Sequence, residues 1–173
     1  MEFEKFERSP VSVAVGGVFH FEQIRDGKVI DAWDESNLVV NEGLTSVLNV
    51  YFKAGTQITA WYIGLFEGNY TPVAGDTMAA FVAAATESTA YTETVRQTYT
   101  TAAVAAQSIT NAATKATFSI NATKTMYGAF MSSVSTKSAT TGTLVAAAKF
   151  AAARSLVSGD QLLVTYVFTA TSA

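Results

Sequence analysis

The polar positions of this chain are filled mainly by threonine, serine and asparagine rather than by charged residues. Ala and Thr together supply almost a third of the 173 residues, and only 14% of all residues are charged. Threonine has a branched Cβ that suits a pleated strand, and its hydroxyl tolerates either water or an interface. The composition therefore favours β-sheets whose surfaces contact other surfaces, and it supplies few groups for catalysis.

The length of 173 residues favours one domain over two small ones, and a chain of this length buries roughly 70% of its extended surface. The chain has no Cys, which excludes disulfides, thiolate catalysis and Cys-ligated zinc. The first residues are charged and lack the apolar core of a signal peptide, and no uncharged apolar stretch is long enough for a transmembrane helix. We expect an N-terminal arm over residues 1–10, which orders only against a partner, and a single β-rich domain over residues 11–173.

Turn signals separate short apolar runs along most of the chain. The Asp26-Gly27 pair predicts a type I′ hairpin between a strand at 11–24 and one at 29–33. Gly16-Gly17 indicates either a bulge or a close backbone approach in the first of these strands. Further strands are expected at 60–66, 114–120, 125–134 and 161–169, and the sequence from residue 90 on reads as a run of Thr-rich and Ala-rich strands.

A turn at 121–122 predicts that the strand at 125–134 returns along the one at 114–120. In the last strand, alternation places one set of side chains on one face and a second set on the other: Leu162, Val164, Tyr166 and Phe168 against Leu163, Thr165 and Val167. The alanines of 144–157 also suit a helix, but the surrounding strands favour a strand there.

Two segments have helical signals. Residues 41–52 place Leu44, Val47, Leu48 and Tyr51 on one apolar stripe, with Asn41 as a possible N-cap. Asp76 could cap a brief helix over 77–85. Eight or more short strands, one or two short helices and the absence of a βαβ repeat predict a mainly β fold, an antiparallel β-sandwich or a jelly-roll-like arrangement.

The charges are unevenly distributed in the sequence. Residues 1–96 hold thirteen acids against six bases, and residues 97–173 hold one acid against five bases. Either these charges are scattered over a solvated surface, or the molecule is polarised and docks onto a charged surface. Nucleic acid is a poor partner, because the chain is acidic overall and no segment clusters basic with aromatic residues.

Few residues offer chemistry. The single histidine, His20, reads as an exposed strand residue without a nucleophile or an orienting partner in any known motif. The acids after the hairpin lack the dense oxygen pattern of a calcium loop. Glu87 and Glu93 could be a carboxylate pair for glycoside cleavage, but a surface position is the better interpretation. We therefore predict no enzyme, no metal and no cofactor.

Aromatic residues around 61–70 have two interpretations. They could line a sugar-binding groove, but Trp61 and Phe66 are better explained as core residues. Tyr70 falls in a loop over 67–76, so it is the aromatic residue of this group whose exposure decides between the two interpretations.

Turns and core positions follow one another in a characteristic order over roughly residues 15–170. These positions are 27–30, 37–44, 62–66, 71–72, 75–77, Glu87, Ala90, Tyr91, Arg96, Phe118, Gly128, Arg154 and 158–162. Their order resembles that of a class of tailed-bacteriophage virion structural proteins, and in particular the capsid decoration, or cement, proteins of short-tailed phages.

The resemblance implies a non-enzymatic β-rich protein on the outside of the head that clamps major capsid protein subunits, as a homo-oligomer made in the host cytoplasm and without a membrane or nucleic-acid partner. A tail or fibre component that binds a host glycan is the alternative. The expected contact residues lie in the arm and in the 67–76 loop: Phe3, Phe6, Arg8, Tyr70, Thr71 and Pro72.

Overall fold

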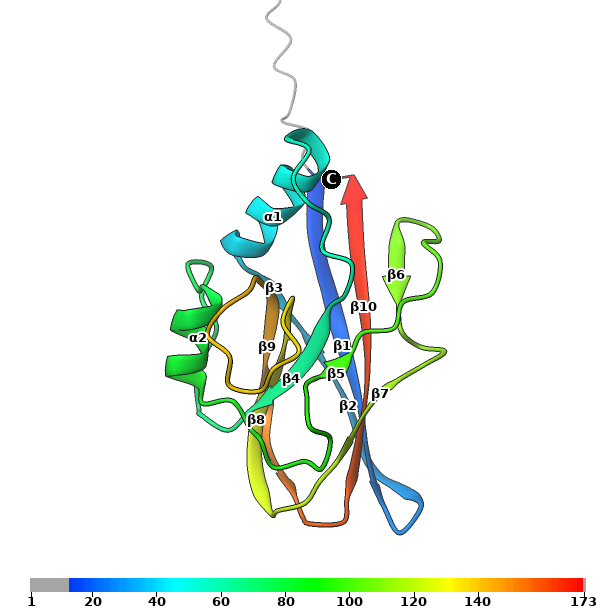
Figure 1. The fold of residues 1–173 in the computed structure, drawn as a ribbon. Coiled ribbons are helices and arrows are strands. Elements are labelled where there is room, and N and C mark those ends of the chain that lie inside the picture. Colours follow the sequence, from blue (N-terminus) through cyan, green and yellow to red (C-terminus); the bar gives the residue numbers. More distant parts are fainter. Residues whose placement is uncertain (1–12, 173) are drawn as a thin grey trace, which may run out of the picture.

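The computed structural model describes residues 13–172, which form two antiparallel sheets packed as a sandwich (Figure 1). The first sheet contains, in order, β2 (Lys28–Ser36), β1 (Val13–Arg25) and β10 (Gln161–Ser172), and the far edge of β10 pairs with β6 (Ser108–Thr110) and β7 (Ala116–Ser119). The second sheet has the order β3 (Leu38–Val39), β9 (Leu144–Leu156), β8 (Lys124–Ser132), β4 (Tyr62–Phe66) and β5 (Gln97–Thr98). With the helices α1 (Asn41–Phe52) and α2 (Met78–Ala85), this arrangement confirms a mainly β sandwich with short helices.

The predicted hairpin is present as β1 and β2. Asp26 and Gly27 both have positive φ, 50° and 73°, as a type I′ turn requires. Pairing of β1 with β10 is continuous across Gly16 and Gly17, so no bulge lies there. Gly17 instead marks a close approach, because a Cβ on it would collide with the Val167 carbonyl oxygen.

The long strand β10 alternates as the sequence predicted. Leu162, Val164 and Tyr166 are buried, whereas the residues between them are only partly covered. Between the short edge strands β6 and β7, Asn111 donates to the Val164 carbonyl and accepts from the Tyr166 amide. One buried amide side chain therefore continues the edge pairing of β10 where the backbone ladder is interrupted.

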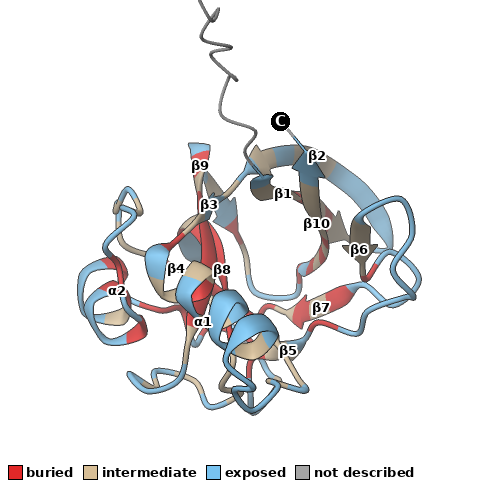
Figure 2. Cartoon of the chain, turned by 90° about the horizontal axis from the view of Figure 1, so that it is seen from above, coloured by how far each residue is buried: buried red, intermediate tan, exposed pale blue. Residues whose placement is uncertain are grey.

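The main core lies between the sheets, where buried residues of the two layers face each other (Figure 2). Aromatic rings dominate it: Phe19 stacks on Tyr166 at 4.2 Å between ring centroids, and Phe21 meets Phe150 edge-on at 4.8 Å. Its other large members include Ile63, Leu65, Phe118, Met126, Leu156 and Leu162.

A second core lies on the other face of the second sheet, under α2. Phe81 of α2 contacts Phe66 and Phe130, with ring centroids 5.4 and 5.2 Å away. The sheet is therefore covered on both faces at β4, which explains why that strand is a short continuous apolar run. The helix begins after Thr77, whose hydroxyl accepts from the Ala80 amide, so Thr77 and not Asp76 is its N-cap.

Three local expectations need correction. The strand after 120 does not return against β7, because β8 belongs to the second sheet and pairs with β9 and β4. The stretch between α2 and β6 is largely irregular, with only the two-residue strand β5 in place of longer Thr-rich strands. The helix α1 is preceded by Val40 as N-cap, without a side-chain capping bond, so Asn41 is not the cap.

Candidate interaction surface

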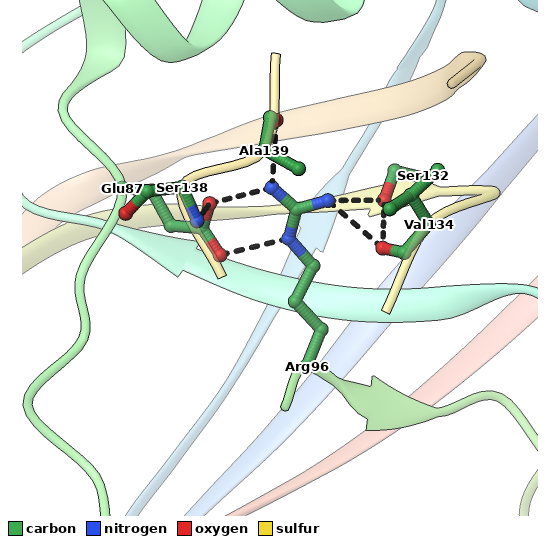
Figure 3. A network of polar contacts seen from close by, with 6 residues as sticks. All are labelled: Glu87, Arg96, Ser132, Val134, Ser138 and Ala139. Atoms are coloured by element: carbon green, nitrogen blue, oxygen red, sulfur yellow. Dashed lines mark hydrogen bonds and ion pairs between the residues drawn. The ribbon is translucent and has the colours of Figure 1, made fainter. Parts of the chain in front are cut away.

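The two acids that sequence analysis paired as possible catalysts are used in the fold. Glu87 forms a bidentate ion pair with Arg96, with distances of 2.8 and 2.6 Å from Nε and Nη2 to the carboxylate oxygens (Figure 3). The side chains of Arg96 and Glu87 are 0% and 1% exposed. The surface position expected for Glu87 is therefore wrong. The second acid, Glu93, accepts from the Ser119 amide at 3.1 Å.

The buried pair joins two irregular segments of the chain. Besides Glu87, the Arg96 guanidinium donates to the Ser132 hydroxyl and to the carbonyls of Val134 and Ala139. The Ser138 amide donates to Glu87 at 2.8 Å. All these partners surround the guanidinium in Figure 3, and they hold the loop after β8 against the segment after α2. Both carboxylate oxygens are hydrogen-bonded inside the protein, so this geometry suits anchoring and not proton transfer to a substrate.

His20 and the hairpin acids have separate partners. His20 Nδ1 lies 2.6 Å from Asp34 Oδ1 on the outer face of the first sheet, with a 42% exposed side chain. Asp31 accepts from Arg154, and Glu35 accepts from the Ala151 amide. Within residues 13–172, no three His, Asp or Glu side chains come together as a metal site would require.

Asp160 closes the turn between β9 and β10. It accepts from Gln23, from Arg25 and from the Val157 amide, and its side chain is fully buried. The hydrogen bond from Arg25, together with those from Val157 and Gln23, lowers the pKa of Asp160 to about 2, although burial opposes this shift. The group therefore stays ionised at neutral pH and fixes the end of the sandwich that lies opposite α1.

Part of the uneven charge of the two sequence halves is paired between the halves inside the fold. Bases of the second half contact acids of the first half in Lys115–Glu22, Lys124–Glu67 and Arg154–Asp31. The reverse pairing occurs between Arg25 and Asp160. The fold places the two halves side by side, so these contacts neutralise part of the charge difference along the sequence.

The predicted contact residues of the 67–76 loop are held in place by the fold. The Tyr70 hydroxyl donates to Asp76 at 2.8 Å, which raises the pKa of Tyr70, and its ring contacts Phe81. Thr71 is exposed and accepts from Lys149, and Pro72 is half-buried. Tyr70 is thus partly covered rather than free. The other predicted contacts, Phe3, Phe6 and Arg8, lie outside the described residues.

Four exposed apolar side chains lie together on α1. Here we name this group the apical patch, formed by Val47, Leu48, Tyr51 and Phe52, whose exposed fractions are 49, 55, 80 and 72%. In Figure 2 the second half of this helix is drawn mostly in the exposed colour. Aromatic and aliphatic side chains grouped in this way on a surface mark interaction sites. The sequence predicts an apolar stripe on this helix, but none of its residues signals that the stripe faces solvent.

The reason for this exposure is the way in which α1 contacts the second sheet. Gly43 is its one buried residue, and it lies so close to β9 that a Cβ on it would come within 2.7 Å of the Val145 carbonyl oxygen. The Glu42 carboxylate accepts from the backbone amides of Met78 and Leu144, which fixes the start of the helix. Because the helix face that carries Gly43 packs against the sheet, the exposed part of the apolar stripe faces solvent.

A groove adjoins the apical patch. We name it the apical groove; it consists of two neighbouring depressions of about 300 and 250 Å³ that share Val47, Gln57, Ile58, Trp61 and Val145. The larger depression is also lined by Ile109 of β6 and Phe168 of β10, two strands of the first sheet. Its floor is fixed by Tyr99, which donates to the carbonyls of Ile109 and Tyr166, and burial raises the pKa of both tyrosines.

Comparison with models of known protein families and with curated proteins gave no match. Among residues 13–172, neither helix has the length and apolar character needed to cross a bilayer.

Proposed function

We propose that this protein is a non-enzymatic structural component of a bacteriophage virion. In this proposal it binds the outside of the head as a decoration protein, bridges major capsid protein subunits, and acts as a homo-oligomer after synthesis in the host cytoplasm. The resemblance in the order of turns and core positions suggests the virion. The observation that carries the adhesive role is the apical patch, with two aromatic and two aliphatic side chains exposed on one helix.

The physical argument is that adhesion and folding use different residues. The close contacts of α1 with the sheet and with α2 are made by Gly43 and Glu42, so the exposed area of the apical patch remains available to a partner. Burying such side chains against a partner supplies roughly 1.5–3 kcal/mol for each one that becomes fully covered. That contribution is modest for one copy, but many copies on one shell add their contacts through avidity.

The placement of the acids favours adhesion over hydrolysis. Glu87 is committed to Arg96, Asp160 to Arg25, and Asp31 to Arg154. A glycosidase needs two carboxylates that face one substrate across a cleft. Here the pairs stabilise the fold at separate places.

The alternative is a tail or fibre component that binds a glycan. It is favoured by the exposed aromatic pair at the end of α1, where Tyr51 and Phe52 have ring centroids 4.9 Å apart. Aromatic faces of this kind can also cover a sugar ring, so the position of the protein on the particle distinguishes the two functions.

The test is to locate the protein on phage particles. Gold-labelled antibodies should decorate the heads of purified particles; label on the tails alone would support the alternative, and unlabelled particles would refute a virion role. A Leu48→Ser/Tyr51→Ser variant should lose at least about tenfold in occupancy. The matched control is Val29→Ser, which removes an exposed apolar side chain from β2 at the other end of the sandwich and should leave occupancy unchanged.

A further inference from the structure

The apical groove is an apolar site beside the point where the N-terminal arm joins the sandwich. Val13 pairs with Ser172 at the end of β10, and Phe168 of the same strand lines the groove. Figure 1 shows α1, the start of β1 and the end of β10 at one end of the molecule. The arm therefore enters the fold at the same end as the groove.

The lining of the groove has one chemical character. Aromatic, aliphatic and methionine side chains dominate it, and no charged residue is among them. The remaining lining residues are small or uncharged and polar: Gly43, Ser46, Gln57, Thr59 and Thr101. Such a site selects apolar side chains and disfavours charged ones, which would lose water without gaining a partner. An occupant therefore needs apolar anchors that alternate with charges able to stay in water.

The first twelve residues of this chain have that character. Phe3 and Phe6 are large apolar side chains, and they are separated and flanked by acids and bases. Seven Cα-to-Cα steps separate Phe6 from Val13 along the chain, a reach of roughly 23 Å when extended. This reach allows Phe6 to enter a groove at the same end of its own sandwich or that of a copy alongside.

We infer that the apical groove is the receptor for residues 1–12 of this chain, with Phe3 and Phe6 as anchors in its two depressions. The outer edge of β2 is a poorer receptor, since it carries charged residues such as Lys28 and Asp34 that are typical of a protected sheet edge. Docking within one molecule would cover the groove, and docking between molecules would link neighbouring copies into an oligomer. The inference does not depend on a virion location.

The natural absence of cysteine allows a direct test on the full chain. Glu4→Cys is combined with Gln57→Cys, an exposed position that borders both depressions. The control combines Glu4→Cys with Thr171→Cys, an exposed position opposite Ala14 in the ladder. A segment without a preferred site would reach position 171 at least as readily, because it lies beside the start of β1.

We expect the disulfide at position 57 to form at least about tenfold faster than that at position 171, because docking raises the local concentration of the thiol. A cross-linked monomer identifies docking within one molecule, and a cross-linked dimer identifies docking between copies. Adding Phe3→Ser and Phe6→Ser should abolish the preference, whereas Glu2→Gln and Glu7→Gln should preserve it. Equal rates at the two positions, or a preference that survives loss of both phenylalanines, would overturn the inference.

Discussion

Replacing Arg96 by methionine is the most informative perturbation of this fold. Methionine has similar length but carries no charge and no donors, so the substitution leaves Glu87 buried without its cation. It also removes the donor to Ser132, Val134 and Ala139.

The expected loss of stability depends on how deeply an ion pair is buried and not on the distance between its charged atoms. Breaking a buried ion pair by removing one partner costs about 3–5 kcal/mol. Lys115 and Glu22 form an ion pair at 2.6 Å, the same distance as Arg96 Nη2 to Glu87, but both of those side chains are 36% exposed. An exposed pair contributes about 0.2–1 kcal/mol, so Lys115→Met is the matched control.

The assay is urea unfolding followed by fluorescence and circular dichroism, with the midpoint and slope fitted together. Arg96→Met should lower the free energy of unfolding by at least about 3 kcal/mol, which corresponds to roughly 6–12 °C in Tm for a chain of this size. A Glu87→Gln/Arg96→Met double variant should lose less than the sum of the single losses, by about 1–3 kcal/mol, because it leaves no uncompensated charge. A loss below about 1 kcal/mol for Arg96→Met, or additive losses in the cycle, would refute the reasoning.

Three further outcomes are expected. Asp160→Asn should cost about 2–3 kcal/mol at pH 7, because the pKa of Asp160 is lowered from 3.8 to about 2 in the folded state. The stability that ionised Asp160 supplies is fully present above its pKa in the unfolded chain and is lost as the pH falls through its pKa in the folded protein. In acid titrations of unfolding, the difference in free energy of unfolding between wild type and Asp160→Asn should therefore shrink between about pH 4 and pH 2. A difference that stays constant over this range would contradict the argument. Gly43→Ala should destabilise by about 1–3 kcal/mol in thermal unfolding, because the new Cβ meets the Val145 backbone, whereas Gly75→Ala has open space and should be neutral; equal effects would refute the close helix contact. Occupancy on particles should change little between about 0.05 and 0.5 M salt, because the apical patch is uncharged; a steep fall would indicate a charged docking face.

Local signals in the sequence predicted much of this fold. The Asp26-Gly27 turn and the alternation of β10 are properties of neighbouring residues, so they could be read before any tertiary contact was known. The strand at 144–157 was decided correctly against the helix propensity of its alanines, because strands flank it on both sides. Which strands pair with each other was harder to predict from the sequence, because β7 and β8 are adjacent in sequence but lie in different sheets.

The buried ion pair could not be predicted because nothing local marks it. Glu87 and Arg96 are nine residues apart in an irregular segment, and a charged residue without a pattern is expected at the surface. For α1 the periodicity was read correctly, but its orientation depends on Gly43, whose lack of a side chain lets one face approach β9. An apolar stripe predicts that a surface needs a partner, and only the fold shows whether that partner lies inside the molecule.

The separation between the groups that hold the sandwich together and those of the apical patch has a functional consequence. Two apolar cores, the Arg96 network and the Asp160 turn supply stability, and none of them includes the exposed residues of α1. If α1 packed against the sheet through its apolar stripe, those side chains would stabilise the fold, and they would not be exposed for binding to a partner. Because it packs through a glycine, the patch can change with its partner while the fold stays intact. Substitutions in the patch should therefore alter binding without altering unfolding, and substitutions in the Arg96 network should lower stability first and binding only as a result.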